Sequence, residues 1–249
     1  MSEPLSISEI FSSIQGERML AGRRQIFVRL MDCNLDCRYC DTDFVKTDIC
    51  RLETQPGSGN FLKLPLPLQL HNISALLHDW LVQLPAAHLS VSFTGGEPLL
   101  HADALVEWFT EIRKILPIHL ETNGTMPAAL QKVKGCVDYI SMDMKLPSTA
   151  GCSEQLWDLH ALFLRECYGS NVSVKVVVGE AASDSEIMQV CDVIASVDAA
   201  LPLFLQPLSR PDGSVGIAAP RLFHLQELAS SRLPDVRVIP QMHKLLGVL

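Results

Sequence analysis

Three cysteines crowd into one short stretch of the sequence. Cys33, Cys37 and Cys40 stand at positions i, i+4 and i+7. They directly follow the apolar run 26–31, which is typical of a β-strand, so we expect them in the loop at the C-terminal end of that strand. Three thiolates this close together repel one another unless a cation holds them. The stretch therefore indicates a soft metal centre.

Two kinds of metal centre take three thiolates. Zinc normally requires a fourth protein ligand in a structural site, or a histidine or carboxylate in a catalytic one. An iron–sulfur cube held by three cysteines instead leaves one iron open, and an open iron can bind a small molecule. The spacing of Cys33, Cys37 and Cys40 lets three thiolates reach three corners of one cube. We therefore interpret residues 33–42 as a cluster loop.

A glycine-rich turn, TGGEP (94–98), follows the apolar segment 88–93, which we expect to be a strand. Glycines allow the backbone to approach a ligand closely, and the carboxylate of Glu97 can accept hydrogen bonds from an ammonium group. Taken alone, such a turn is a weak indication of a binding site.

Two features ahead of the cysteines are suited to a polar ligand. In EIFSSIQGE (9–17) a polar turn interrupts an apolar pattern, as in an N-terminal hairpin or in a loop that offers backbone amides and Gln15 to a ligand. Arg29 lies in an apolar strand, where its guanidinium needs an anionic partner. That partner is either the carboxylate of a ligand, which fits the planar fork, or the side chain of an ordinary ion pair.

Alternating strands and helices must position these residues. The pattern predicts helices over about 72–84, 102–116, 153–168, 183–197 and 220–232, and strands over 26–31, 88–93, 118–121, 137–142, 172–178, 203–205 and 236–239. Crossover connections of this kind produce a parallel sheet with right-handed units. About six such units are too few to close an eight-stranded barrel, so we predict an α/β fold, an open partial (β/α)6 barrel. The polar motifs should then meet at the C-terminal ends of the strands.

The chain shows no internal repeat and no linker, so we expect a single domain over 1–249. The stretch 48–70 stands out, because PGSGN (56–60) and PLP (65–67) are typical of loops. It is too long for a simple connection, and we interpret it as an insertion or a lid.

Composition limits the classes of function. Apolar residues make up 48% of the chain and charged residues 19%, which argues against disorder. A net charge of −8 without a long basic run disfavours direct contact with nucleic acid. No signal peptide and no membrane-spanning run is recognisable, so we expect a cytoplasmic protein without membrane contact. There the five scattered cysteines should be free thiols, with Cys50, which follows the cluster loop, as the candidate exception.

Together these motifs resemble those of a known family. C-x3-C-x2-C is the cluster motif of the radical S-adenosylmethionine (SAM) enzymes, and TGGEP resembles their GGEP element, which binds the amino group of SAM. Within that superfamily the chain is similar to the 7-carboxy-7-deazaguanine synthases. The shared residues are spread over most of its length: EIFSSIQGE, Arg29, CNLDCRYCDT, FTGGEP, ETNGT, LQPL and QMHKLLG.

The resemblance implies a reaction and its cofactors. The family, carbon–nitrogen lyases, converts 6-carboxy-5,6,7,8-tetrahydropterin to 7-carboxy-7-deazaguanine with loss of ammonia, on the route to queuosine and related 7-deazapurines. It uses a 4Fe-4S cluster, SAM and Mg2+. The SAM-derived radical takes a hydrogen from C6 of the pterin, the ring contracts, and SAM is regenerated. A one-electron donor such as a flavodoxin and a homodimer are also implied.

The resemblance further assigns roles to individual residues, none of them catalytic beyond the cluster and the radical. It implies 4Fe-4S ligation by Cys33, Cys37 and Cys40, and Mg2+ ligation by Thr42. It implies pterin contacts from Ile14, Gln15, Gly16, Arg29, Thr94 and His243. It implies SAM contacts from Tyr39, Cys40, Asp41, Gly96, Glu97, Glu121, Ser141, Asp143, Lys145, Gln206, Pro207, Leu208 and Ser209. Oxygen donors such as those of Asp41 and Thr42 suit a hard cation, and Glu121 would hold the ribose hydroxyls of SAM.

The sequence departs from the family pattern in three places. Arg18 follows Gly16-Glu17, where the common form has a glycine. DMK (143–145) stands where the family has Ser-Pro-Lys. The stretch 48–70 has no assigned role.

Two other functions remain open at this point. An activating enzyme that abstracts hydrogen from a glycine of a partner protein would share the cysteine spacing, but it would not need EIFSSIQGE, Arg29 or the Asp41-Thr42 pair. A non-catalytic module would hold zinc in a fully ligated site. Turnover of the carboxypterin separates the synthase from the first alternative, and an iron content of about four per chain separates it from the second.

Overall fold

The computed structural model describes residues 3–40, 47–152 and 156–249. Within these ranges ten strands form one sheet in the order β10-β9-β8-β7-β6-β5-β2-β1-β3-β4. The strands that run parallel are β2 Arg24–Leu30, β5 Val91–Gly95, β6 Ile118–Thr122, β7 Tyr139–Asp143, β8 Val172–Val178, β9 Leu203–Pro207 and β10 Val236–Val238. The predicted open partial (β/α)6 barrel is confirmed.

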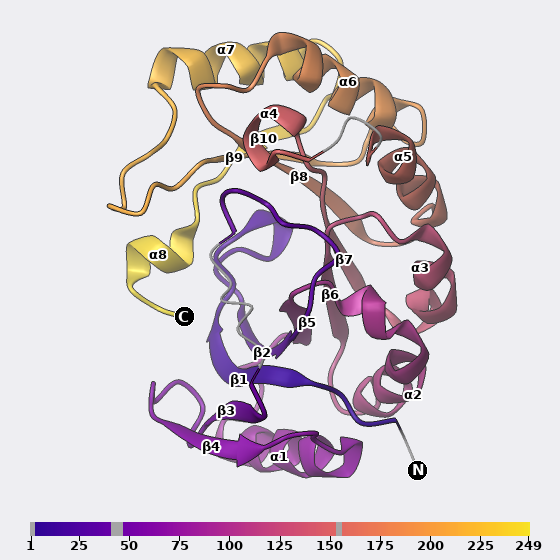
Figure 1. The fold of residues 1–249 in the computed structure, drawn as a ribbon, viewed down its shortest axis with the longest axis vertical. Coiled ribbons are helices and arrows are strands. Elements are labelled where there is room, and N and C mark those ends of the chain that lie inside the picture. Colours follow the sequence, from indigo (N-terminus) through magenta and orange to yellow (C-terminus); the bar gives the residue numbers. More distant parts are fainter. Residues whose placement is uncertain (1–2, 41–46, 153–155) are drawn as a thin grey trace.

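Helices connect the parallel strands and cover the outer side of the curved sheet (Figure 1). They are α1 Leu70–Gln83, α2 Ala102–Ile112, α3 Pro127–Val133, α4 Pro147–Ala150, α5 Leu156–Glu166, α6 Asp184–Ala195, α7 Ala219–Ser230 and α8 Met242–Leu246, with 3-10 turns η1 Arg18–Leu20, η2 Pro98–His101 and η3 Lys134–Cys136. None of the helices within the described ranges is long and apolar enough to cross a membrane.

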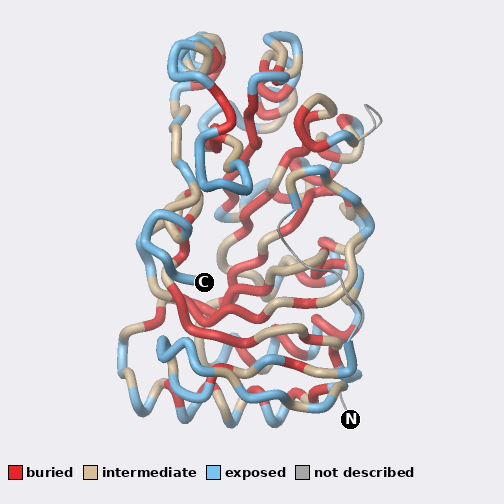
Figure 2. Tube along the Cα trace, turned by 60° about the vertical axis from the view of Figure 1, so that its left-hand side comes forward, coloured by how far each residue is buried: buried red, intermediate tan, exposed pale blue. Residues whose placement is uncertain are grey.

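The core lies between the helices and the sheet, and the buried stretches of the chain follow the strands (Figure 2). All seven residues of β8 are buried, as expected for a strand covered on both faces. On α2 the side chains of Leu105, Trp108 and Phe109 are fully buried, which gives the helix one apolar stripe. At the start of α6, Ser183 and Glu186 form a reciprocal capping box.

Several helix ends differ from the prediction. α1 begins at Leu70 with Gln69 as N-cap, so the predicted start of the helix, at Asn72, lies inside the first turn. The reason is that Leu70 is buried, and packing of its side chain outweighs the local preference of asparagine for a cap. α2 ends at Ile112, because Ile115 N bonds to Ile112 O in a tighter turn.

The N-terminal hairpin is confirmed, and the stretch 48–70, interpreted as an insertion or a lid of loop-like composition, contains two strands. β1 Ile7–Ile14 pairs antiparallel with β2. β3 Ile49–Glu53 and β4 Phe61–Pro65 form a second hairpin, in which β3 lies parallel to β1 and β4 is the edge strand of the sheet (Figure 1). Loop residues fill only its tip, where Glu53 accepts hydrogen bonds from Gly57 N at 3.0 Å and Gly59 N at 2.7 Å. Cys50 is buried on β3, and it and the other four scattered cysteines are outside any disulfide, as the prediction of free thiols requires.

Candidate functional site

A cavity of about 900 Å³ lies at the C-terminal ends of the parallel strands. Its lining comes from β1 and the turn after it, from the cysteine loop, from the ends of β5 to β9, and from the segment after β10. The motifs that are separate in the sequence therefore meet here, as the order of strands and helices predicts. A cavity of this size accommodates a cofactor and a small substrate side by side.

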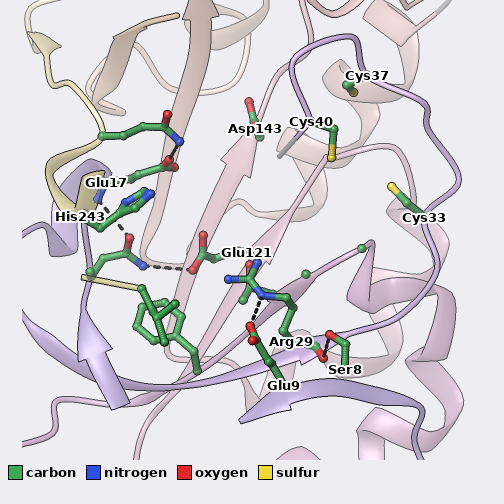
Figure 3. A pocket seen from close by; sticks show the side chains of 18 of the residues that line it. Ser8, Glu9, Glu17, Arg29, Cys33, Cys37, Cys40, Glu121, Asp143 and His243 are labelled. Atoms are coloured by element: carbon green, nitrogen blue, oxygen red, sulfur yellow. Dashed lines mark hydrogen bonds and ion pairs between the residues drawn. The ribbon is translucent and has the colours of Figure 1, made fainter. Parts of the chain in front are cut away.

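The cysteine loop forms one wall of this cavity. Cys33, Cys37 and Cys40 all line it (Figure 3), and Cys40 is exposed. Asn123, directly after β6, anchors the loop: its Nδ2 donates to Asn34 Oδ1 at 2.8 Å and lies 3.9 Å from Cys33 Sγ. Burial raises the pKa of the Cys37 thiol to about 12. Three soft sulfur donors on one wall of a cavity fit an iron–sulfur cluster.

The two glycines of TGGEP are required for packing against the cysteine loop. Gly95 adopts φ +103°, and a Cβ there would lie 2.5 Å from Leu30 O. A Cβ on Gly96 would collide with the backbone carbonyl of Asp32. Glu97 N donates to that same carbonyl at 2.8 Å. Any side chain at either glycine would therefore separate the end of β5 from the loop that carries the cysteines.

Three of the residues assigned to SAM lie away from the cavity. The carboxylate of Glu97 is fully buried and accepts hydrogen bonds from Leu99 N at 3.1 Å, Thr122 Oγ1 at 2.8 Å and Asn123 N at 2.7 Å. Burial raises its pKa to about 7 in spite of these donors. Ser141 Oγ is paired with His119 Nε2 at 2.8 Å, and Pro207 is buried. In this structure Glu97 links the end of β6 to the glycine turn and does not line the cavity.

The floor of the cavity carries three carboxylates and three cations: Glu17, Glu121, Asp143, Arg18, Lys145 and Lys175. Lys145 Nζ lies 2.8 Å from Asp143 Oδ2, and Lys175 Nζ lies 3.2 Å from the same oxygen. Lys175 also pairs with Glu17 Oε2 at 2.8 Å. Burial alone would raise the pKa of Asp143, but Lys145, Lys175 and Arg18 lower it. These acids are therefore ionised at neutral pH.

Glu121 connects this floor to the N-terminal turn. Its Oε1 accepts hydrogen bonds from Gln15 Nε2 at 3.0 Å and Ser92 Oγ at 2.8 Å, and its Oε2 accepts one from Arg18 Nη1 at 3.3 Å. Gln15 also donates to Gln25 Oε1 at 3.0 Å. The turn predicted to bind substrate and the residue predicted to bind the ribose are thus directly bonded to each other.

Arg29 lies on the wall formed by the two hairpins (Figure 3). Its Nε is 3.3 Å from Glu9 Oε2, and its guanidinium lies 5.6 Å from the centre of the Phe11 ring. Glu9 also binds Arg51 Nη1 at 2.5 Å, and Lys63 lines the same wall. Arg29 is therefore part of an ordinary ion pair and at the same time faces the cavity with 29% of its side chain exposed.

The segment after β10 closes the side of the cavity next to the first turn. Met242 N donates to Gly16 O at 2.9 Å, and Gln241 Nε2 donates to Glu17 Oε1 at 3.0 Å. A Cβ on Gly16 would lie only 2.6 Å from His243 N, so a glycine is needed for this contact. His243 lines the cavity beside that turn (Figure 3).

The structure brings most of the predicted site residues together. Those that line the cavity are Ile14, Gln15, Gly16, Arg29, Cys33, Cys37, Tyr39, Cys40, Thr94, Gly96, Glu121, Asp143, Lys145, Gln206, Leu208, Ser209 and His243. Asp41 and Thr42 lie outside the described residues. Sequence reasoning did not find Glu17 and Lys175, nor did it give Arg18 a role. A lysine in the apolar run 172–178 was the one signal available for Lys175.

Comparisons with known proteins agree on the type of site. Residues 30–150 match the family model of the radical SAM superfamily. The 7-carboxy-7-deazaguanine synthase of Geobacter sulfurreducens is 45% identical over all of both chains, and that of Methanothermobacter thermautotrophicus is 34% identical over 97% of each. The structure of QueE from Escherichia coli shares the fold, with a TM-score of 0.60 and 22% identity over 96% of this chain and 94% of that one.

Proposed function

The chain belongs to the family of 7-carboxy-7-deazaguanine synthases in the radical SAM superfamily, and from that membership we propose how its cavity serves the reaction. The enzyme contracts the ring of 6-carboxy-5,6,7,8-tetrahydropterin to give 7-carboxy-7-deazaguanine, with loss of ammonia, in 7-deazapurine biosynthesis. One observation carries the assignment of the site: three free cysteines and the cavity-facing arginine Arg29 line the same cavity.

Cys33, Cys37 and Cys40 hold the 4Fe-4S cluster. When bound, the cluster supplies the electron that cleaves SAM to a 5′-deoxyadenosyl radical. The protein's part is to fix SAM beside the cysteine loop and to exclude water from it. We assign SAM contacts to Tyr39, Gly96, Glu121, Asp143, Lys145, Gln206, Leu208 and Ser209, all of which line the cavity.

The pterin occupies the side of the cavity next to the N-terminal turn. The guanidinium of Arg29 binds its carboxylate, because a planar fork pairs with two oxygens. Gln15 and the backbone of 14–16 suit the donor and acceptor edge of the ring. Thr94 and His243 complete the pocket, and Thr42 is assigned to Mg2+ by the family resemblance alone. The hairpin within 48–70 contributes a wall through Ile49, Arg51 and Lys63, so the chain functions as one domain.

Two partners belong to this proposal. A flavodoxin is the proposed electron donor, and the exposed position of Cys40 supports its access, because an electron must reach the cluster from the protein surface. A homodimer is proposed from the family resemblance. The alternative of a glycyl-radical activating enzyme is not favoured, since the relatives are synthases that match over their whole length.

Anaerobic turnover tests the proposal. Protein with a reconstituted, reduced cluster is incubated with SAM and the carboxypterin, and the product is identified by mass spectrometry. We expect 7-carboxy-7-deazaguanine and ammonia in equal amounts, with SAM not consumed. Cleavage of SAM without any deazaguanine product would refute the assignment of the substrate.

A further inference from the structure

Arg18 occupies a backbone position that is unfavourable for its residue type. Its φ is 56°, in the left-handed region that favours glycine. Its side chain is only 3% exposed even though it carries a charge. Its Nε is buried without a hydrogen-bond partner among the described residues. Neither the local conformation nor a hydrogen bond from Nε therefore accounts for an arginine at this position.

The surrounding carboxylates do account for it. Arg18 Nη1 lies 3.3 Å from Glu121 Oε2, and Arg18 Nη2 lies 3.8 Å from Asp143 Oδ2. Glu17 Oε2 is 4.0 Å from the same Nη2. Glu121 and Asp143 end the neighbouring strands β6 and β7, so the two nitrogens of one guanidinium bridge two adjacent strand ends.

The charge balance of the cavity floor depends on this bridge. Lys145 and Lys175 offset two of the three carboxylates, and Arg18 offsets the third. Removal of Arg18 would leave one buried carboxylate charge without a compensating cation, at the carboxylate oxygens that Arg18 now contacts. Repulsion between the two strand-end carboxylates would then turn Glu121 away from its present orientation.

The orientation of Glu121 determines which oxygen can bind a ligand. Its Oε1 already accepts two hydrogen bonds, from Gln15 and Ser92, whereas its Oε2 accepts one, from Arg18. A carboxylate oxygen accepts about two hydrogen bonds. The open acceptor position is therefore on Oε2, the oxygen that Arg18 contacts.

We propose that Arg18 is a positioning residue for SAM, which holds Glu121 so that Oε2 accepts a hydrogen bond from a ribose hydroxyl. This inference rests on the proposed contact between Glu121 and SAM. It explains why this chain keeps an arginine at a position suited to glycine: the guanidinium both neutralises and orients the carboxylate.

The test compares Arg18→Met with Arg18→Gly in the cluster-loaded protein, with SAM as the probe in anaerobic calorimetry. Arg18→Met keeps a long side chain without the charge. Arg18→Gly also removes the charge, and glycine adopts the positive φ of this position without strain. Both should weaken SAM binding about tenfold, the size of one charged hydrogen bond. Wild-type affinity for SAM in both variants would overturn the inference.

A double-mutant cycle with Glu121→Gln separates positioning from a structural role. If Arg18 acts through Glu121, Arg18→Met should add little to the loss of affinity in Glu121→Gln. Additive losses would overturn the inference, because they would show that Arg18 supports SAM binding independently. Unchanged SAM binding in Glu121→Gln alone would refute the assignment of Glu121 itself. Weakened SAM binding in Glu121→Gln together with wild-type SAM binding in Arg18→Met would refute only the role of Arg18.

Discussion

Replacement of Arg29 by alanine separates its two contacts, the ion pair with Glu9 and the proposed bond to substrate. The ion pair is partly exposed, with 29% of the Arg29 side chain and 12% of the Glu9 side chain accessible, and Glu9 keeps a second partner in Arg51. Its loss should therefore lower the free energy of unfolding by no more than about 1 kcal/mol. A charged hydrogen bond to the pterin carboxylate contributes about 1.5–3 kcal/mol, which corresponds to roughly tenfold to hundredfold weaker pterin binding.

The assay measures pterin affinity and SAM cleavage in the same variant. We expect Arg29→Ala to bind the pterin weakly and to keep reductive cleavage of SAM, now uncoupled from product. Glu9→Gln is the matched control, because it breaks the same ion pair and leaves the guanidinium in place. Unchanged pterin affinity in Arg29→Ala, or an equal loss in Glu9→Gln, would show that Arg29 serves only the ion pair.

Three further outcomes are expected. Cys37→Ala should abolish both iron loading and SAM cleavage, as measured by iron assay and chromatography. Cys136→Ala, outside the cavity, should retain both. SAM cleavage in Cys37→Ala would disprove the cluster assignment. Glu97→Gln should lower the free energy of unfolding by about 1–3 kcal/mol in urea titrations, because the new amide NH2 would face a donor such as Asn123 N. Wild-type stability of this variant would show that the hydrogen bonds to Glu97 do not stabilise the fold. Burial alone would raise the pKa of Glu17, but Lys175 and Arg18 lower it from an ordinary 4.5 to about 2. The stability that this carboxylate adds is present above pH 4.5 and is lost as the pH falls toward 2, so Glu17→Gln should flatten the acid limb of a stability–pH profile; an acid limb as steep as that of the wild type would contradict this pairing.

The sequence alone predicted the fold and the cofactor. Strict alternation of apolar runs with helical patterns produces a parallel sheet, and polar motifs that follow the strands must meet at one edge of it. The spacing of Cys33, Cys37 and Cys40 is a local property, so it can be read without knowing where the loop lies. The strand over 172–178 was predicted to the residue for the same reason, because its run of β-branched residues is also a local pattern.

Contacts between distant segments were decided by the tertiary structure. The loop-like composition at 56–60 concealed a hairpin, because strand pairing of 49–53 with β1 depends on a partner about forty residues away. Glu97 belongs to the family motif, yet its carboxylate accepts a hydrogen bond from the backbone N–H of Asn123, directly after β6. Arg18 and Lys175 became part of the site only through carboxylates that lie far away in the sequence. A motif records which residues are present, whereas burial and charge balance depend on all the side chains that folding brings within a few ångströms, and no local pattern encodes those.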